Sequence, residues 1–353
     1  MGAVKSAFQF ASAPALASAF LFGATTPLAK QLLANTSPLL VAGLLYLGSG
    51  LGLTLWVLIQ DRGRAPSGIP RSQWPWLVSA VAAGGVAAPA LLMYGLARAD
   101  AATASLLLNL EVVLTAAIAW VFFREATSRQ IVLGFAAILS GSVLLTWPGQ
   151  AKGQIPAGPL LAIAGACLFW ALDNNLTRRI SAGDARVIAG IKGVGAGTTN
   201  TVLALWLGAR LPVASHIMAT LALGFFGYGV SLVLFVYSLR QLGTARTGAF
   251  FATAPFIGGA VALLLYGQHG GWEFWAAAMC MAIGVWLHLT ARHVHEHTHE
   301  PIAHSHAHVH DEHHQHTHDS GWDGVEPHTH EHRHEPLRHS HPHFPDIHHR
   351  HAH

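Results

Sequence analysis

The densest set of potential metal ligands in this 353-residue sequence follows Arg292, where histidine recurs at nearly every second position. In an extended chain the pattern His-x-His-x-His places the histidines on one side, close enough to chelate one ion. Imidazole suits Ni²⁺, Co²⁺, Cu²⁺ and Zn²⁺, and interleaved acids such as Glu296, Glu300 and Asp311 add carboxylate ligands. No tightly bound cofactor is indicated elsewhere. We predict that nickel, cobalt or zinc binds at His295, His297, His299, His304, His306, His308, His310, His313, His314, His316 and His318.

Charge and composition separate this tail from the rest of the chain. Beyond Arg292 lie 23 of the 26 histidines, ten acids and three arginines, a net charge of −7 with histidine neutral. The first 292 residues hold 17 basic and seven acidic residues, a net charge of +10, which gives the total of +3. Since the tail has too few apolar residues for a core, we expect residues 293–353 to be disordered without metal.

A second group of chemically capable residues interrupts long apolar stretches. A charge at the centre of a bilayer costs about 2.5–3.5 kcal/mol, so each one needs a reason. Either the group faces a cavity in which Glu111 or Asp173 binds a cation or proton in turn, or an ion pair only fixes helix packing. For Lys192 we favour an ion pair, because an unpaired ammonium would repel a metal cation. The candidate pathway residues are Asn109, Glu111, Asp173, Asn174, Asn175 and Lys192.

Membrane-spanning helices are the elements that must position this second group. Spanning a bilayer takes about 20 apolar residues, and such runs recur throughout the first 292 residues. The sequence therefore predicts an all-α integral membrane protein in the lipid bilayer. No nucleophile–base arrangement, phosphate loop or nucleotide motif is present, which argues against an enzyme, an ATP-driven pump and a nucleic-acid partner. We count ten transmembrane runs, at 11–33, 38–60, 73–97, 100–123, 128–147, 157–178, 184–207, 214–239, 243–266 and 271–291.

The basic residues between these runs predict the orientation. With the N-terminus in the cytoplasm, twelve basic residues lie near the inner side and four near the outer side. This bias agrees with the positive-inside rule. An even number of spans returns the chain to the cytoplasm, so we expect a multi-pass protein of a bacterial inner membrane with both termini cytoplasmic.

The chain also resembles itself. YGLARAD at 94–100 aligns with YSLRQLG at 237–243, and this offset of 143 continues through the next two spans, whereas earlier spans align at an offset of 147. Each half holds five spans, an odd number, so the halves must enter the membrane from opposite sides. Inverted repeats are a recurring transporter architecture. We predict two five-helix repeats at 1–150 and 151–292, followed by the tail at 293–353.

Glycine spacing predicts close contacts within this architecture. Gly48 and Gly52 in the second run, and Gly193 and Gly197 in the seventh, are four residues apart. Such small-xxx-small spacing lets helix backbones approach each other closely. We expect these two helices to use the glycines for packing.

Three stretches resemble a known family. LFGATTPLAK (21–30) and LFWALDNNLTR (168–178) are similar to the opening helices of the two EamA repeats in the drug/metabolite transporter superfamily, and ADAATASLLLNLEVVLTAAIAWVFFRE (99–125) resembles its most recognisable segment. The resemblance implies secondary export of small solutes. Val112 stands where the family commonly has proline and Leu45 where a basic residue is common, whereas Pro255 and Lys192 keep these residue types in the second half.

Two functions remain open from the sequence. The first is secondary active export of divalent transition metals, nickel and cobalt first and zinc also, conferring metal resistance. The histidine tail, similar to those of nickel/cobalt exporters, would then collect metal at the inward-facing mouth. The alternative is export of amino acids or other small metabolites, with a tail that only buffers or senses metal. A membrane-anchored metal store would leave the repeat unexplained, and a homodimer is compatible with either function.

Overall fold

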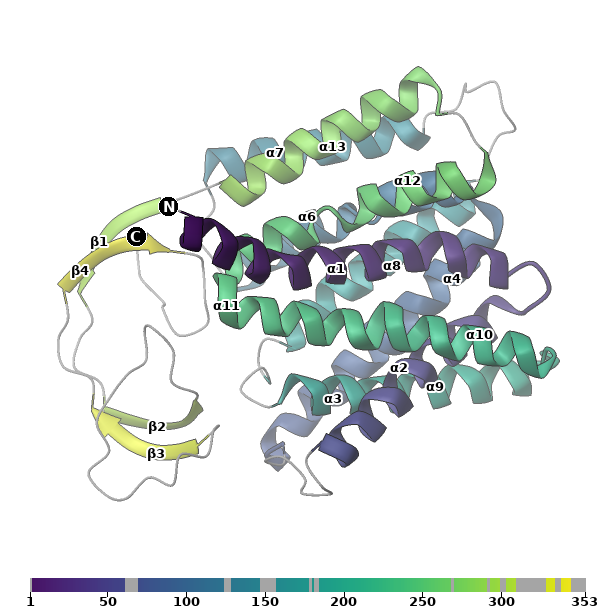
Figure 1. Ribbon diagram of the computed structural model, residues 1–353, viewed down its shortest axis with the longest axis horizontal. Helices are drawn as coiled ribbons and strands as arrows, with labels where there is room; N and C mark the ends of the chain where they lie inside the picture. Colours follow the sequence, from purple (N-terminus) through teal and green to yellow (C-terminus); the bar gives the residue numbers. More distant parts are fainter. Residues whose placement is uncertain are drawn as a thin grey trace.

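The protein is a bundle of helices with a small strand-containing tail at one end (Figure 1). Apolar side chains cover much of its outside, among them Leu264, Trp206 and Phe122. Such a surface is typical of a protein surrounded by lipid. The computed structural model describes residues 2–60, 69–123, 128–146, 157–177, 180, 184–267, 270–290, 293–298, 303–308, 328–333 and 338–343.

The helices of the two halves follow each other in the same order. The first half contains α1 (Gly2–Leu32), α2 (Pro38–Gln60), η1 (Arg71–Gln73), α3 (Trp74–Ala80), η2 (Val81–Ala87), α4 (Ala88–Arg98), α5 (Ala101–Leu107), α6 (Leu110–Phe123) and α7 (Arg129–Thr146). The second half contains α8 (Ala157–Thr177), α9 (Ala185–Trp206), α10 (Ala214–Gly224), η4 (Phe225–Val230), α11 (Ser231–Phe251), α12 (Ala254–Tyr266) and α13 (Trp272–Thr290).

Eight helical stretches of the described chain are long and apolar enough to cross a membrane. They coincide with eight of the ten predicted runs. The other two runs form α1 and α9, which are helical but are not among the eight. The eight stretches are Pro38–Gln60, Arg71–Arg98, Ala101–Phe122, Arg129–Thr146, Ala157–Thr177, Ala214–Ser238, Thr247–Tyr266 and Trp272–Thr290.

One predicted helix boundary is wrong. The predicted runs 214–239 and 243–266 leave a gap at 240–242, but α11 continues through this gap to Phe251. The interruption falls instead at 252–253, directly before Pro255 in the first turn of α12. Proline lacks the N–H that a continuing helix would need, whereas polar residues and glycine alone do not stop a helix. The first half has a matching interruption at 108–109, between α5 and α6.

Both halves contain a π-helical segment in their third span. η2 and η4 are wider turns in which the hydrogen bonds skip one residue further than in an α-helix. Gly84 and Gly227, which the offset of 143 pairs, lie within these two segments. The repeat therefore extends to a local irregularity that hydropathy alone does not reveal.

Helices of each half pack against helices of the other half. α1 packs along α11 and α12, and its counterpart α8 packs along α4 and α6. The counterparts α2 and α9 pack on each other, as do α7 and α13, and the latter pair runs along one edge of the bundle (Figure 1). Each half therefore completes the core of the other.

Close glycine contacts show the symmetry of this arrangement. A Cβ at Gly284 would lie 2.7 Å from the carbonyl oxygen of Gly134, and one at Gly141 would lie 2.9 Å from that of Ala277. The offset of 143 relates these two contacts, because it pairs Gly141 with Gly284 and Gly134 with Ala277. In the α2–α9 contact, a Cβ at Gly193 would lie 3.0 Å from the Tyr46 carbonyl oxygen and one at Gly197 would lie 2.9 Å from that of Gly43. Gly48 and Gly52 pack closely instead on Leu221 of α10 and Phe225 of η4, so all four glycines lie in close helix contacts.

The tail contains four short strands. β1 (His293–Thr298) pairs with β4 (Arg338–His343), and β2 (Ala303–His308) pairs with β3 (His328–Arg333), both antiparallel. The expectation of disorder is therefore wrong for these four segments. The alternating pattern that suggested a single chelating chain is also the period of a β-strand, and pairing satisfies the backbone groups of both partners. Figure 1 shows the strands at the end of the bundle where α1 begins.

Candidate functional site

An ion pair connects α8 and α9 at the centre of the candidate site. The Lys192 ammonium donates to Asp173 Oδ1 at 2.6 Å, to Asp173 Oδ2 at 2.7 Å and to Thr177 Oγ1 at 3.2 Å. An ammonium has three N–H donors, so these bonds use all of them. The two side chains retain only 17% and 10% of their exposed surface. Lys192 thus forms the ion pair that the sequence favoured, and its partner is Asp173.

Helix spacing explains why the second half can build this pair. Asp173 and Thr177 lie four residues apart and share one face of α8, and Thr177 also donates to Asp173 Oδ1 at 2.9 Å. Gly84 in η2 lies directly against the Asp173 carboxylate, and there is no space for a Cβ at this position. The pair is therefore enclosed by α8, α9 and η2.

Hydrogen bonds from asparagine amides join Glu111 and its neighbour Thr115 to α8. Asn174 Nδ2 donates to Glu111 Oε1 at 2.9 Å and to Thr115 Oγ1 at 3.3 Å. Asn175 Nδ2 donates to the Thr115 carbonyl oxygen at 3.1 Å and to that of Ala171 at 2.8 Å. Among the residues whose side chains are described, no cation lies within ion-pair distance of Glu111. The two acids therefore differ, since Asp173 has a paired cation and Glu111 has only amide support.

Two aromatic residues fix the π-helical segment beside the ion pair. Tyr46 Oη donates to the Gly84 carbonyl oxygen at 2.9 Å, and Trp170 Nε1 donates to the same oxygen at 3.0 Å. Asn200 Nδ2 donates to the carbonyl oxygens of Gly85 and Val86, each at 3.3 Å. A π-helical turn displaces backbone hydrogen-bond partners, and these carbonyl oxygens accept side-chain donors from α2, α8 and α9 instead.

Sequence reasoning missed several of these contributors. Tyr46, Thr115, Trp170 and Thr177 carry no charge and do not stand out within apolar runs. A signal existed for two of them, because Trp170 and Thr177 lie four residues before Asn174 and four after Asp173, spacings that share a helix face.

Asn109 lies apart from this cluster. Its amide donates to the Leu106 carbonyl oxygen at 2.9 Å, at the interruption between α5 and α6, and contacts Met281 Sδ at 3.8 Å. Its side-chain oxygen is buried with no protein partner in the described chain, as are those of Asn175 and Asn200. The structure therefore brings Glu111, Asp173, Asn174, Asn175 and Lys192 together on α6, α8 and α9 but places Asn109 toward α13.

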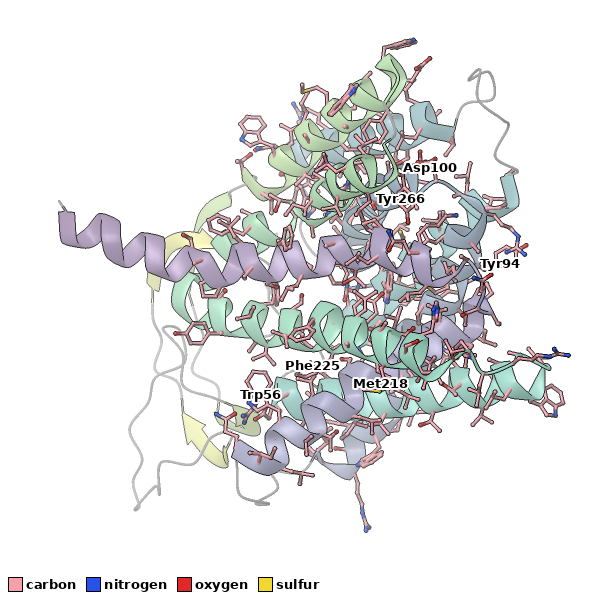
Figure 2. The ribbon with its side chains drawn as sticks, turned by 45° about the vertical axis from the view of Figure 1, so that its right-hand side comes forward. Trp56, Tyr94, Asp100, Met218, Phe225 and Tyr266 are labelled. Atoms are coloured by element: carbon pink, nitrogen blue, oxygen red, sulfur yellow. The ribbon has the colours of Figure 1, made fainter. Side chains whose placement is uncertain are left out.

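The opposite end of the bundle holds a different lysine contact. Lys30 Nζ donates to the carbonyl oxygens of Leu96, Ala97 and Ala99, at 2.6, 3.1 and 3.0 Å. Asp100 caps α5 here by accepting from the Thr103 N–H, and Tyr266 donates to the Pro27 carbonyl oxygen (Figure 2). Lys30 therefore neutralises the negative end of α4 and does not join the candidate site.

Potential metal ligands are distributed unevenly. Within the part of the chain whose side chains are described, no group of three or more His, Cys, Asp or Glu residues is placed to hold a metal ion. Among the predicted tail ligands, His295 and His297 lie in β1, and His304, His306 and His308 lie in β2. The others lie outside the described residues, namely His299, His310, His313, His314, His316 and His318.

Comparisons with known proteins identify the family. The EamA-like transporter family matches residues 10–147 and 157–290, one match in each half. An uncharacterized transporter of Methanothermobacter thermautotrophicus is 26% identical over 266 residues, which cover 71% of this chain and 77% of the relative. A protein of known crystal structure aligns with a TM-score of 0.57 at 20% identity, covering 79% of this chain and 96% of that one, and supports the same fold.

The matched stretches lie within the two predicted repeats, whose exact bounds stay a prediction. The matched stretches contain all the helices that form the candidate site. The family consists of transporters rather than enzymes and agrees with the drug/metabolite transporter superfamily. The chain is therefore a multi-pass membrane protein that belongs to the EamA-like transporter family.

Proposed function

We propose that this protein is a secondary active exporter of divalent transition-metal cations, nickel and cobalt first and zinc also. One observation carries the choice of substrate, the tail with 23 of the 26 histidines. Imidazole ligands at this density favour these metals over Mg²⁺ or Ca²⁺, which prefer oxygen. A tethered chelating tail raises the metal concentration near the transport path.

The proposal includes ten membrane crossings with both termini in the cytoplasm of a bacterial cell. The bias of basic residues supports this orientation, and α1 begins at the same end of the bundle as the tail strands (Figure 1). α1 and α9 then supply the two crossings beyond the eight apolar stretches. A cytoplasmic tail can collect metal only on the side from which an exporter takes it.

Glu111 is the proposed first binding group for the transported or coupling cation. A cation that binds at Asp173 must displace the Lys192 ammonium from both carboxylate oxygens. Glu111 requires no such displacement, because its described partner is the neutral amide of Asn174. Successive occupation of the two acids by metal and proton gives the exchange that antiport needs. Asn174 and Asn175 hold α8 in place beside Glu111.

Metal content of cells tests the proposal. The full chain, a version ending at Arg292, Glu111→Gln and Asp173→Asn are expressed in metal-sensitive cells, and nickel, cobalt and zinc are measured. We expect the full chain to lower nickel and cobalt severalfold and Glu111→Gln to abolish this effect. The shortened chain should export at high metal and fail at low metal, because only collection is lost.

Glu273→Gln is the matched control. This acid lies in the first turn of α13, away from the cluster, so the same chemical change should leave export intact. Equal amounts of each variant in the membrane are checked by immunoblot. The proposal is wrong if neither the full nor the shortened chain lowers any metal while an amino acid leaves the cell.

A specific observation supports the alternative, export of amino acids or related metabolites. The cluster presents an ammonium and two carboxylates, which could pair with the opposite charges of a zwitterion. A substrate carboxylate would bind Lys192 and a substrate ammonium would bind Glu111. Under this alternative Lys192→Met abolishes amino-acid export, and metal content follows the presence of the tail alone.

A further inference from the structure

The tail consists of two copies of one sequence unit. HEHTHEPIAHSHAHVHDEHHQHTH at 295–318 aligns with HEHRHEPLRHSHPHFPDIHHRHAH at 330–353 with a constant offset of 35. Ten of the eleven histidines of the first unit meet a histidine in the second, and the Glu-Pro pairs at 300–301 and 335–336 also coincide. The metal ligands of the tail are therefore present twice, in the same order.

The strands obey the same offset. β1 corresponds to β3 and β2 corresponds to β4, each shifted by 35 residues. The pairing crosses between the units, because β1 pairs with β4 and β2 pairs with β3. The registers also correspond, since His295 opposite His341 becomes His330 opposite His306. The two sheets are thus equivalent products of a reciprocal exchange between the units.

Each sheet carries six histidine positions on one face. Residues two apart on a strand share a face. Every histidine of β1 opposes a histidine of β4, and every histidine of β2 opposes one of β3. The pairs are His293–His343, His295–His341 and His297–His339 in one sheet, and His304–His332, His306–His330 and His308–His328 in the other.

This spacing suits transition-metal coordination by nitrogen. Directly opposed positions in an antiparallel pair have Cβ atoms about 4.5–5.5 Å apart. Imidazole nitrogens bind Zn²⁺ at about 2.0–2.1 Å, so ligands from one or two neighbouring cross-strand pairs can reach one ion. The acids of the strands, Glu296 and Glu331, occupy the other face, opposite Ser340 and Ser305. The histidine faces therefore favour Ni²⁺, Co²⁺, Cu²⁺ or Zn²⁺ over cations that prefer oxygen.

We propose that the tail binds divalent transition metals at two equivalent sites, each formed across a strand pair by one segment from each unit. A lone two-stranded sheet with few apolar residues is marginally stable, and a ligand that binds only the paired form stabilises it. This inference builds on the metal-collecting tail of the proposed function. It adds seven ligands to those expected from sequence, namely His293, His328, His330, His332, His339, His341 and His343.

Counting metal sites after replacing whole segments tests the proposal. Purified full-length protein in detergent is dialysed against Ni²⁺, and tight sites are counted with the three histidines of β1 replaced by glutamine. The same triple replacement is then combined with that of β4 or with that of β3. We expect the β1 and β1–β4 variants to lose the same number of sites and the β1–β3 variant to lose twice as many. Independent chelation by each segment makes both combinations lose equally, which overturns the proposal.

The triple variant His313→Gln, His314→Gln, His316→Gln is the matched control, since these histidines lie outside the four strands. When this variant is combined with the β1 replacement, the number of metal sites lost should equal the sum of the losses in the two separate variants. Dialysis against Mg²⁺ should detect no tight sites at the faces. Counting bound metal does not require transport. The two-site proposal can therefore be wrong while metal export is correct, and metal export can be wrong while the two sites exist.

Cross-linking distinguishes exchange between units from a hairpin within one unit. Glu296→Cys is combined with Ser340→Cys, its partner across β1 and β4, or with Ser305→Cys, the corresponding residue of its own unit. Metal-free full-length protein is oxidised with diamide, and tail peptides are identified by mass spectrometry. The first pair should form the disulfide at least tenfold more than the second. Preferential linkage of 296 to 305 contradicts reciprocal pairing.

Discussion

The membrane region and the tail are both built from two copies, but the copies differ in how far they have diverged. In the membrane the halves keep their helix order, glycine contacts and π-helical segments, while the polar residues of the site are concentrated on α6, α8 and α9. In the tail the copies keep the histidines themselves, since His295 and His297 are among the ten that recur 35 residues later. The membrane copies therefore share a scaffold, and the tail copies share their histidines.

The two membrane copies show where charge was introduced. The offset of 147 places Thr26 where the second half has Asp173, and Leu45 where it has Lys192. Gly227 lies against Thr25 much as Gly84 lies against Asp173. The geometry is thus present twice, whereas the ion pair is present once. This difference indicates that the backbone arrangement does not depend on the charges.

Acidification should have the largest effect, which is a loss of metal affinity in both units of the tail. An imidazole with the ordinary histidine pKa of about 6.5 binds metal only when deprotonated. Lowering the pH from about 7.5 to 5.5 costs each ligand roughly tenfold, so a site with three ligands loses about 1,000-fold in affinity. Competition dialysis with Ni²⁺ measures this loss. Separate pH midpoints for the two sets of sites would show that the copies are not equivalent.

Removing one partner of the ion pair should have the next largest effect. Lys192→Met leaves Asp173 as an uncompensated buried acid and should destabilise the protein by about 3–5 kcal/mol. Thermal unfolding in detergent measures the loss. Leu45→Met, the same final residue at the repeat-related position, should cost less than about 1.5 kcal/mol. The double variant Asp173→Asn, Lys192→Met should regain most of the stability, and equal losses in all three would refute the comparison.

Adding one methyl group to each π-helical segment separates packing from charge. Gly84→Ala and Gly227→Ala should each destabilise by about 1–3 kcal/mol, because neither glycine has space for a Cβ. Only Gly84→Ala also displaces the Asp173 carboxylate, so it alone should lower the transport rate beyond what reduced protein level explains. Transport per molecule in reconstituted vesicles provides the measurement. Similar transport by both variants would contradict a special role for the charged copy.

The smallest predicted effect concerns Tyr46. Its hydroxyl donates to the Gly84 carbonyl oxygen, so Tyr46→Phe should cost about 0.5–1.5 kcal/mol. Tyr228, whose ring centroid lies 5.4 Å from that of Tyr46, is the control. Tyr228→Phe should cost less, because its hydroxyl has no hydrogen bond to a described residue. Chemical unfolding in detergent compares the two variants, and a larger loss for Tyr228→Phe would contradict the prediction.

Much of the helix arrangement in the membrane region could be predicted from the sequence, because lipid imposes long apolar runs. An ion pair could be expected for Lys192, since an isolated charge in a bilayer is costly, but the sequence did not decide between Glu111 and Asp173 as the partner. The continuation of α11 through Arg240 and Gln241 could not be predicted, because these residues look like loop residues until the neighbouring helices are known. The segments η2 and η4 also leave no signal in hydropathy.

The pairing of the tail strands could not be predicted. Local alternation marks the histidine positions, yet it cannot show which distant strand each segment pairs with. The separation of Asn109 from Glu111 was missed for a related reason. These residues are two positions apart, but Asn109 lies in the interruption between α5 and α6, whereas Glu111 lies in the first turn of α6. Only Glu111 lies on the face toward Asn174, whereas Asn109 contacts Met281.

The exchange of helices between the halves has a consequence for synthesis in the cell. Ser18 on α1 donates to the Ser231 carbonyl oxygen at 2.8 Å, and Ser231 donates back to that of Ser18 at 3.1 Å, across 213 residues of sequence. At about 5–20 residues per second, a ribosome needs roughly 10–40 s to make that stretch. α1 must therefore wait in the membrane without α11, and during this interval lipid or the insertion machinery contacts the face that α11 later covers.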